Sequence, residues 1–147
     1  MKGQVGLKKV KAKDLGLSKQ AQDFLLFLFQ ESESGRKECA VSDIAAKLNV
    51  SKPAVSRMGR FLAHKGFVKR ARYSLISLLP KGTRLASEIV KKRRIVEVFL
   101  NSRLGLKLRD AEAEAHLLEH SVSSHTIKKL YEFLGKPKLC PHGRKIK

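Results

Sequence analysis

The fold is decided by one stretch, Val41-Ser42-Asp43-Ile44-Ala45-Ala46-Lys47-Leu48-Asn49-Val50-Ser51-Lys52-Pro53-Ala54-Val55-Ser56. Its first half predicts a short helix over residues 41–49, with Ser42 as the capping residue. The apolar side chains of this helix recur at the spacing that places them on a single face, and they are Ile44, Ala45 and Leu48. The pattern predicts a helix that packs on a core through this face.

The second half of the stretch predicts another helix, which follows a tight turn at Asn49-Val50. Ser51 can cap this helix, which we expect to run to about His64 and to end at Gly66. Pro53 falls in the first turn, where the missing N–H of a proline costs nothing. A short helix, a tight turn and a second helix form the helix-turn-helix pattern, whose second helix enters the major groove of DNA.

Two short β-prone runs follow, at 67–73 and 74–78, and they predict a winged helix-turn-helix. From Ser51 to Arg72 the chain has seven lysines or arginines and no acidic residue. A charge run is often only a solvated face. Because the second helix and the wing share one sign here, we expect this surface to contact DNA phosphate.

Helical patterns flank this unit on both sides. Ser18 can cap a helix from Lys19 to about Ser32, whose centre at 24–29 is apolar nearly all round and predicts a core helix. Downstream, we expect a long helix over 81–102 started by Pro80, a helix over 110–121, and a helix through Leu134 capped by Ser123 or Ser124. The predicted fold is mainly α, a winged helix-turn-helix followed by an all-helical domain.

Composition limits the classes of partner and compartment. The 147 residues carry a formal net charge of +19, which favours nucleic acid as partner over a membrane surface. Hydrophobic residues make up 42%, enough for a packed core. No apolar run near 18 residues predicts a membrane span, and no signal peptide is expected. With only Cys39 and Cys140, a reducing cytoplasm is the expected location.

The motif His116-Leu117-Leu118-Glu119-His120 stands in an acidic run of this basic chain. On a helix, positions i, i+3 and i+4 share a face, so two imidazoles and a carboxylate converge and suit a divalent transition metal. Taken alone, such a pattern is more often a surface charge pattern. It is also the motif of inverted zinc peptidases, but the 27 residues after His120 leave little sequence for a third ligand and a substrate cleft.

Together these motifs resemble the diphtheria toxin repressor and manganese transport regulator family. The helix-turn-helix stretch, His64-Lys65-Gly66-Phe67-Val68, Glu114 to His120 and Cys140-Pro141-His142-Gly143 occur in the family's order, and the likeness covers about residues 18–147. The resemblance implies a basic N-terminal arm at 1–17, a winged helix-turn-helix DNA-binding domain at 18–79, and a helical metal-binding and dimerisation domain at 80–147. No enzymatic activity is expected.

The resemblance also implies the function. A homodimer would bind a palindromic operator in double-stranded DNA when Mn²⁺ or Fe²⁺ is bound, with Zn²⁺ binding in vitro, and would repress metal-uptake genes. The metal ligands that carry over are Asp23, His116, Glu119, His120, Glu97 and Glu112. The chain departs from the family at Arg93, which replaces a metal-binding His, and at Leu26, which replaces a carboxylate. We expect one four-ligand site, formed by Asp23 with His116, Glu119 and His120. We hypothesise that Arg93 pairs with Glu97 or Glu112.

The same likeness implies four DNA contacts, since Ser51, Pro53, Ala54 and Arg57 match family contact positions. Ser56 and Lys52 suit phosphate, and we expect phosphate or nonspecific contacts from Arg60, Lys69, Arg70 and Arg72. Arg57 is the candidate for a bidentate contact with guanine, although a phosphate contact remains open. The glycine turn usual for the wing is replaced near Tyr73-Ser74-Leu75.

Other functions stay open at this point. A metal-independent winged-helix regulator would bind its operator in EDTA, and a non-specific architectural protein would show no sequence preference. The loop containing Cys140 and His142 invites a metal interpretation, but structural hydrogen bonds are the favoured one. Cys39 is expected to pack in the core.

Overall fold

The computed structural model describes residues 16–147. Almost all of the expected N-terminal arm, residues 1–15, lies outside the described residues. The elements in chain order are α1 (Lys19–Glu33), β1 (Cys39–Ala40), α2 (Val41–Leu48), α3 (Lys52–His64), β2 (Val68–Arg70), the 3₁₀ turn η2 (Arg72–Ser74), β3 (Leu75–Leu78), α4 (Pro80–Ser102), α5 (Leu108–Leu118) and α6 (Ser124–Phe133).

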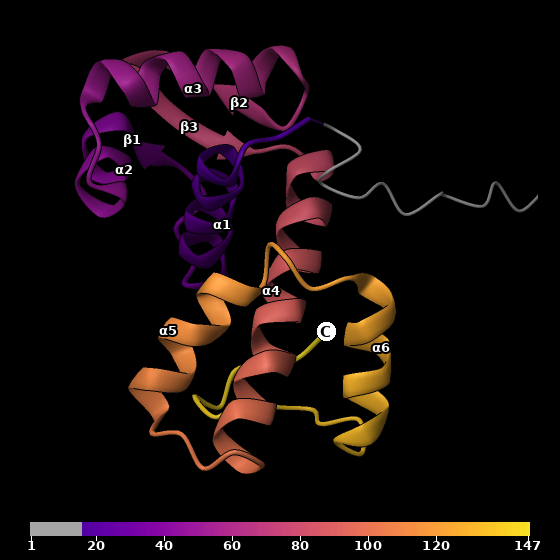
Figure 1. Ribbon diagram of the computed structural model, residues 1–147. Helices are drawn as coiled ribbons and strands as arrows, with labels where there is room; N and C mark the ends of the chain where they lie inside the picture. Colours follow the sequence, from indigo (N-terminus) through magenta and orange to yellow (C-terminus); the bar gives the residue numbers. More distant parts are fainter. Residues whose placement is uncertain (1–15) are drawn as a thin grey trace, which may run out of the picture.

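The first half is a winged helix-turn-helix, as predicted. Helices α1, α2 and α3 pack with a small antiparallel sheet of strand order β1-β3-β2, in which Cys39 pairs with Ile76 and Lys69 with Ser77. The buried core of this half contains Phe24, Leu25, Ile44, Leu62, Phe67 and Ile76. Strands β2 and β3 form the wing beside α3 (Figure 1).

The expected helix caps are confirmed at three helices and wrong at one. Ser18 and Ser51 accept hydrogen bonds from the amides three residues on, at 3.2 Å in both cases. Ser123, one of the two candidates for the last helix, accepts a hydrogen bond from the amide of Thr126 at 3.1 Å. Ser42 does not cap α2, because that helix begins at Val41 with Ala40 as its N-cap. The reason is tertiary: β1 pairs with β3 up to Ala40 and runs directly into the helix, so the sheet fixes where the helix begins.

The second half is helical and is built on α4, which runs from the wing to the far end of the molecule (Figure 1). The N-terminal part of α4 contributes Leu85, Ile89 and Val90 to the first core. Its C-terminal part contributes to a second core that also includes residues of α5 and α6, namely Ile95, Val96, Leu100, Ala111, Ala115 and Ile127. Within residues 16–147, no helix is long and apolar enough to cross a membrane.

A buried ion pair fastens the two halves together. Arg94 of α4 is only 6% exposed, and it donates to both carboxylate oxygens of Glu33 at the end of α1, at 2.6 and 3.2 Å. The same guanidinium donates to the backbone carbonyl of Lys145 at 2.7 Å. One side chain therefore ties together α1, α4 and the C-terminal segment.

Close packing between the wing and α4 depends on Gly82. A Cβ atom at this position would lie 2.2 Å from the carbonyl oxygen of Phe67. That carbonyl also accepts a hydrogen bond from the amide of Leu79, so it cannot move without loss. The absence of a side chain at Gly82 thus sets the approach of α4 to the DNA-binding half.

We expect Gly82→Ala to lower the free energy of unfolding by about 2 kcal/mol or more, because backbone must shift to admit the methyl group. Urea unfolding of the metal-free protein measures the effect. Glu88→Ala, an exposed position on the same helix, is the matched control and should change stability by less than about 0.5 kcal/mol. Equal stability of the Gly82→Ala variant and the wild type would show that the close contact is dispensable.

Candidate metal centre

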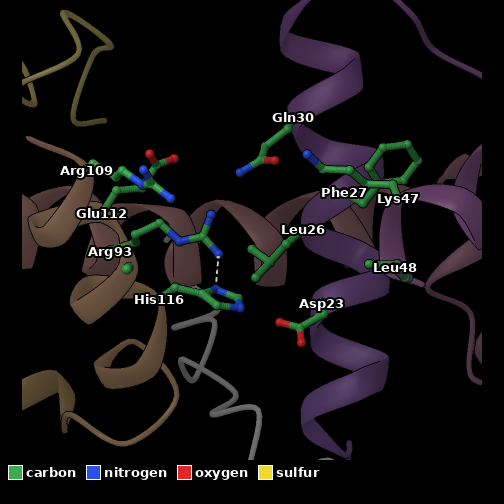
Figure 2. A pocket seen from close by; sticks show the side chains of 11 residues that line it. Asp23, Leu26, Phe27, Gln30, Lys47, Leu48, Arg93, Arg109, Glu112 and His116 are labelled. Atoms are coloured by element: carbon green, nitrogen blue, oxygen red, sulfur yellow. Dashed lines mark hydrogen bonds between the residues drawn. The ribbon is translucent and has the colours of Figure 1, made fainter. Parts of the chain in front are cut away.

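The two halves face each other across a cleft of about 540 Å³, which lies between α1 and α5. Asp23 and Leu26 project from α1 on one side, and Arg93 and His116 lie on the other (Figure 2). Leu26, the departure noted in the sequence, presents only hydrocarbon at this edge of the cleft. Asp23 is therefore the one carboxylate that α1 contributes to the lining of this cleft among the described residues.

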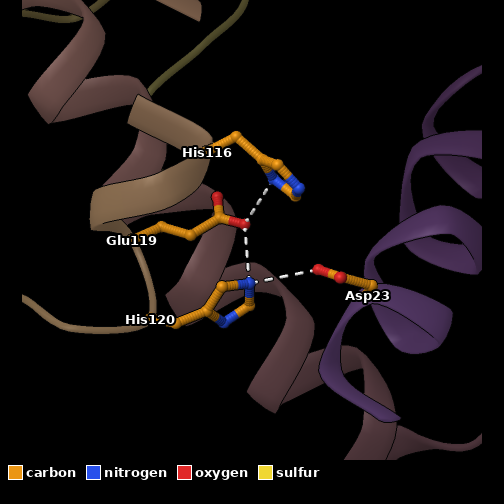
Figure 3. Close-up of side chains that lie close together, drawn as sticks. All are labelled: Asp23, His116, Glu119 and His120. Atoms are coloured by element: carbon orange, nitrogen blue, oxygen red, sulfur yellow. Dashed lines mark hydrogen bonds and ion pairs between the residues drawn. The ribbon is translucent and has the colours of Figure 1, made fainter. Parts of the chain in front are cut away.

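Four of the predicted ligands come together at the end of this cleft. Asp23, His116, Glu119 and His120 each offer a ligand atom, and these atoms all lie within 4.8 Å of one another (Figure 3). Asp23 comes from α1 of the DNA-binding half, whereas His116 is on α5 and the other two follow at its C-terminus. The cluster thus bridges the two halves of the molecule.

His120 is held by hydrogen bonds on both ring nitrogens. Its Nδ1 lies 2.7 Å from Oε1 of Gln22, and its Nε2 lies 3.1 Å from both Asp23 Oδ1 and Glu119 Oε1. Burial alone would lower the pKa of His120, but the hydrogen bonds to Asp23 and Glu119 raise it to about 9. In the metal-free protein, a proton on Nε2 therefore joins the two carboxylates.

Gln22 was not identified from the sequence. An amide oxygen only accepts hydrogen bonds, so its contact fixes a proton on Nδ1 of His120. Nε2 is then the nitrogen that can present a lone pair to a metal once its own proton leaves. Gln22 is itself anchored, because its Nε2 donates to the carbonyl of Leu17 at 3.1 Å.

Both carboxylates remain anionic in this environment. Burial acts to raise the pKa of Glu119, which is 1% exposed, but the hydrogen bonds from His120 and Arg93 hold that pKa below its ordinary value. The pKa of Asp23 is likewise lowered, because the hydrogen bond and charge of His120 outweigh burial. Two anionic carboxylates and two imidazoles are a donor set that fits Mn²⁺, Fe²⁺ or Zn²⁺.

Arg93 also lies in this cluster, and its partner differs from the one hypothesised. Its guanidinium makes two hydrogen bonds to the carboxylate of Glu119, one of them 2.7 Å from Nη2 to Oε1, and it lies 2.8 Å from Nδ1 of His116. The pairing with Glu97 or Glu112 was wrong. Packing of α5 on α4 leaves the buried Glu119 carboxylate facing Arg93, while Glu97 faces the C-terminal loop.

Glu97 and Glu112, the predicted ancillary ligands, lie apart from the four-residue cluster. His142 reaches both of them, with Nδ1 3.5 Å from Glu97 Oε2 and Nε2 3.7 Å from Glu112 Oε2. Glu97, Cys140 and His142 also offer ligand atoms within 4.8 Å of one another. Burial raises the pKa of Glu97, partly offset by the positive charge of His142.

Structural hydrogen bonds, and not a site, were the favoured prediction for Cys140 and His142. The signal was present in the motif Cys140-Pro141-His142-Gly143, but its partner Glu97 is far away along the chain. The C-terminal segment folds back on itself, with Leu139 bridged to Lys145 and the amide of Cys140 bonded to the carbonyl of Arg144 at 2.9 Å. This turn carries the motif onto α4.

The predicted DNA contacts lie on α3 and the wing. Eight are exposed, namely Ser51, Lys52, Pro53, Arg57, Arg60, Lys69, Arg70 and Arg72, and the side chains of Ala54 and Ser56 are half-buried. At the wing tip, Tyr73 and Ser74 adopt positive φ angles of 59° and 58°, where a glycine is more usual. Tyr73 is 92% exposed.

Two family profiles match consecutive parts of the chain. Residues 16–75 match the profile described as iron dependent repressor, N-terminal DNA binding domain. Residues 79–147 match the profile described as iron dependent repressor, metal binding and dimerisation domain. Together they cover nearly all of the described residues.

Curated relatives include the transcriptional regulator MntR of Salmonella typhimurium, which is 39% identical over 85 residues, 58% of this chain and 54% of that protein. The iron-dependent repressor IdeR of Mycobacterium tuberculosis is 31% identical over 103 residues, 70% of this chain and 45% of that protein. An HTH-type transcriptional regulator of Methanocaldococcus jannaschii is 30% identical over 82% of this chain and 96% of its own length. The chain thus spans about half the length of MntR and IdeR.

Solved structures of manganese-dependent regulators are similar to this chain in fold. The manganese regulator SloR superposes with a TM-score of 0.76 at 36% identity, covering 88% of this chain and 60% of that one. A manganese-dependent transcriptional repressor in complex with manganese gives a TM-score of 0.80 at 31% identity, covering 86% of this chain and 57% of that one.

The raised pKa of His120 predicts a pH-dependent stability. Below the unfolded value of 6.5, His120 is protonated in both states and its ion pairs contribute fully. As pH rises towards the folded value of about 9, this contribution, on the order of 3 kcal/mol, is lost. Urea unfolding of metal-free wild type and His120→Ala should therefore differ most at pH 6 and least at pH 9, and a difference independent of pH would contradict the assignment.

Proposed function

This chain belongs to the iron-dependent repressor family, and from that premise we propose that it is a metal-activated transcriptional repressor that binds a palindromic operator as a homodimer. The observation that carries the proposal is the position of the four-residue cluster. Asp23 belongs to the DNA-binding domain and His116, Glu119 and His120 to the metal-binding and dimerisation domain. A metal bound at this cluster would contact both domains.

The mechanism follows from what these residues hold. Asp23, His116, Glu119 and His120 would hold a divalent metal, which would supply a fixed double positive charge to the two carboxylates. Asp23 sits on α1, which packs in one core with α2 and α3, so fixing Asp23 fixes α3 relative to the second domain. In a homodimer, two α3 helices must enter major grooves about 34–36 Å apart. Restricting their positions before DNA binds raises affinity without any metal contact to DNA.

The donor set and the relatives guide the choice of metal. The cluster has nitrogen and oxygen donors and no thiolate, which favours Mn²⁺ or Fe²⁺, with Zn²⁺ able to bind in vitro. Manganese is named for SloR and for the repressor solved with manganese, and zinc is bound in one structure of ScaR. We propose Mn²⁺ or Fe²⁺ as the activating ion, with metal-uptake genes as targets and the cytoplasm as location.

Exposed hydrophobic side chains of the second domain support the homodimer. Large hydrophobic side chains are exposed on or beside α5 and α6, namely Leu104, Leu108, Leu117, Leu118 and Phe133. Burying them between two copies would place the two DNA-binding domains around a two-fold axis, which matches a palindrome.

One alternative has support from a specific contact. Because Arg93 occupies Glu119 and His116, a regulator that folds with a permanent internal cation and needs no metal is the second candidate. The non-specific architectural alternative rests on the charge of +19 alone. The zinc-peptidase alternative is set aside, since the family consists of transcriptional regulators.

The test is selection of bound fragments from the source genome by metal-stripped protein, with Mn²⁺ or with EDTA, at about 150 mM salt to suppress purely electrostatic binding. A palindrome enriched only with Mn²⁺ supports the proposal. The same palindrome in both conditions identifies the metal-independent regulator, and no enriched sequence identifies the architectural protein.

Glu119→Ala should abolish the stimulation of operator binding by Mn²⁺, because the variant lacks the buried carboxylate of the cluster. We expect a loss of about tenfold or more in metal-dependent affinity, with weak salt-sensitive binding retained. Fluorescence anisotropy of labelled operator measures it. Glu114→Ala, an exposed carboxylate of the same helix, is the control, and metal stimulation of Glu119→Ala equal to that of this control would refute the site.

Arg57→Ala and Lys69→Ala should weaken DNA binding in different ways. If Arg57 contacts guanine, its loss costs about 1–3 kcal/mol on the operator and relaxes preference at one base pair. Loss of Lys69, on the wing, should weaken binding to all sequences alike and reduce the slope of log affinity against log salt by about 1. Uniform weakening by Arg57→Ala would instead assign Arg57 to phosphate.

A further inference from the structure

Arg93 contacts two of the four residues proposed to hold the metal. Its Nη2 lies 2.7 Å from Glu119 Oε1 and 2.8 Å from His116 Nδ1, and its Nε donates to the other oxygen of Glu119. The arginine side chain is 14% exposed and that of Glu119 is fully buried. The guanidinium therefore occupies donor atoms that a metal would need.

The contact with His116 determines what that imidazole can do. Arginine has donors and no acceptor, so the 2.8 Å contact is a hydrogen bond only when Nδ1 of His116 presents its lone pair. The single proton of the neutral ring is then on Nε2. Nδ1 of His116 also lies 3.0 Å from Oε1 of Glu119, so this nitrogen faces both the guanidinium and the carboxylate. While Nδ1 accepts from Arg93, neither nitrogen of the neutral ring has a free lone pair for a metal.

The positive charge of Arg93 also opposes the binding of a metal. A guanidinium stays protonated at any pH at which the protein is folded, so Arg93 is a fixed positive charge beside the cluster. A divalent cation entering between Asp23, Glu119 and His120 would be repelled by it, and the repulsion is weakly screened because the pair with Glu119 is buried.

The structure also offers the arginine a place to go. The cleft that borders Arg93 is open and is lined by a second carboxylate, that of Glu112, whose side chain is 60% exposed. Figure 2 shows both residues on the same wall. A guanidinium released from Glu119 would find solvent and a carboxylate nearby, so its release does not leave a buried unpaired charge.

We propose that Arg93 is an internal competitor of the metal, which holds the empty site closed and raises the metal concentration at which it fills. The inference rests on the proposed function. Metal can bind Glu119 and His116 only when the guanidinium has left them. The measured metal affinity is therefore lower than the intrinsic affinity of the four ligands, by the free energy needed to break the Arg93 contacts. Arg93 is thus a positioning residue that sets a threshold for the response.

The test compares Mn²⁺ affinity of wild type, Arg93→Met and Arg109→Met, by competition with a fluorescent chelator. Arg93→Met removes the competitor and keeps an apolar side chain of similar length, so we expect about tenfold tighter Mn²⁺ binding. Arg109 lines the same cleft and is exposed, so its variant controls for a general loss of positive charge and should bind as wild type does.

A second variant and a second readout address folding. Arg93→Gln keeps a donor for His116 without the charge and should also bind Mn²⁺ more tightly, which carries the test if Arg93→Met fails to fold. Nitrogen-15 NMR of the histidine rings should show His116 protonated on Nε2 in metal-free wild type, and a shift of the proton to Nδ1, which faces the Glu119 carboxylate, in Arg93→Met. These shifts report the contact independently of DNA binding.

The outcomes separate the two proposals. Mn²⁺ affinity of the folded Arg93 variants equal to or weaker than wild type, while wild type binds Mn²⁺, would overturn the competition and leave the proposed function standing. Failure of the wild type and the variants alike to bind Mn²⁺ would overturn the proposed function itself, and this inference with it.

Discussion

The junction between the two halves depends on the cost of burying the charge of Glu119. A carboxylate without access to water must be paired and hydrogen-bonded, and the protein supplies two cations for it, Arg93 from α4 and His120 from the end of α5. The same proton of His120 that satisfies Glu119 also reaches Asp23 on α1. The need to neutralise one buried carboxylate thus brings together three elements. In the metal-free protein, the proton of His120 and the guanidinium of Arg93 contact the carboxylate oxygens that a metal would need.

The rest of the architecture makes this junction effective. Helix α4 belongs to both hydrophobic cores, so the two halves share a rigid element. Arg94, adjacent to the competitor, binds the far end of α1 through Glu33, while Gln22 and Asp23 hold α1 near its start. Because α1 is held at both ends and shares one core with α2 and α3, a constraint on the position of Asp23 is also a constraint on α3, as the proposed mechanism requires.

The residues of the second cluster suggest why the C-terminal segment is folded as it is. The turn that carries Cys140 and His142 onto Glu97 is closed by the same segment whose Lys145 carbonyl accepts from Arg94. The polar groups of this segment and of the α1–α4 contact therefore share one buried arginine. Through Arg94, the C-terminal segment after α6 is connected to the first helix of the fold.

Much of this protein was predictable from sequence because the signals are local. The helix-turn-helix, the caps at Ser18 and Ser51, the wing, and the convergence of His116, Glu119 and His120 all depend on residues within a turn or two of each other, where backbone geometry fixes the spacing. The participation of Asp23 came from resemblance, since no local pattern joins it to His120, 97 positions away. Tertiary structure alone decided the rest. The pairing of β1 with β3 sets the start of α2 at Val41. The packing of α5 on α4 determines that Arg93 pairs with Glu119 and not with Glu97. The grouping of Glu97 with Cys140 and His142 was set by the return of the C-terminal turn. These outcomes depend on packing between segments that are distant in the sequence. The sequence offers several carboxylates as possible partners for each cation, and only the packing determines which one the cation contacts.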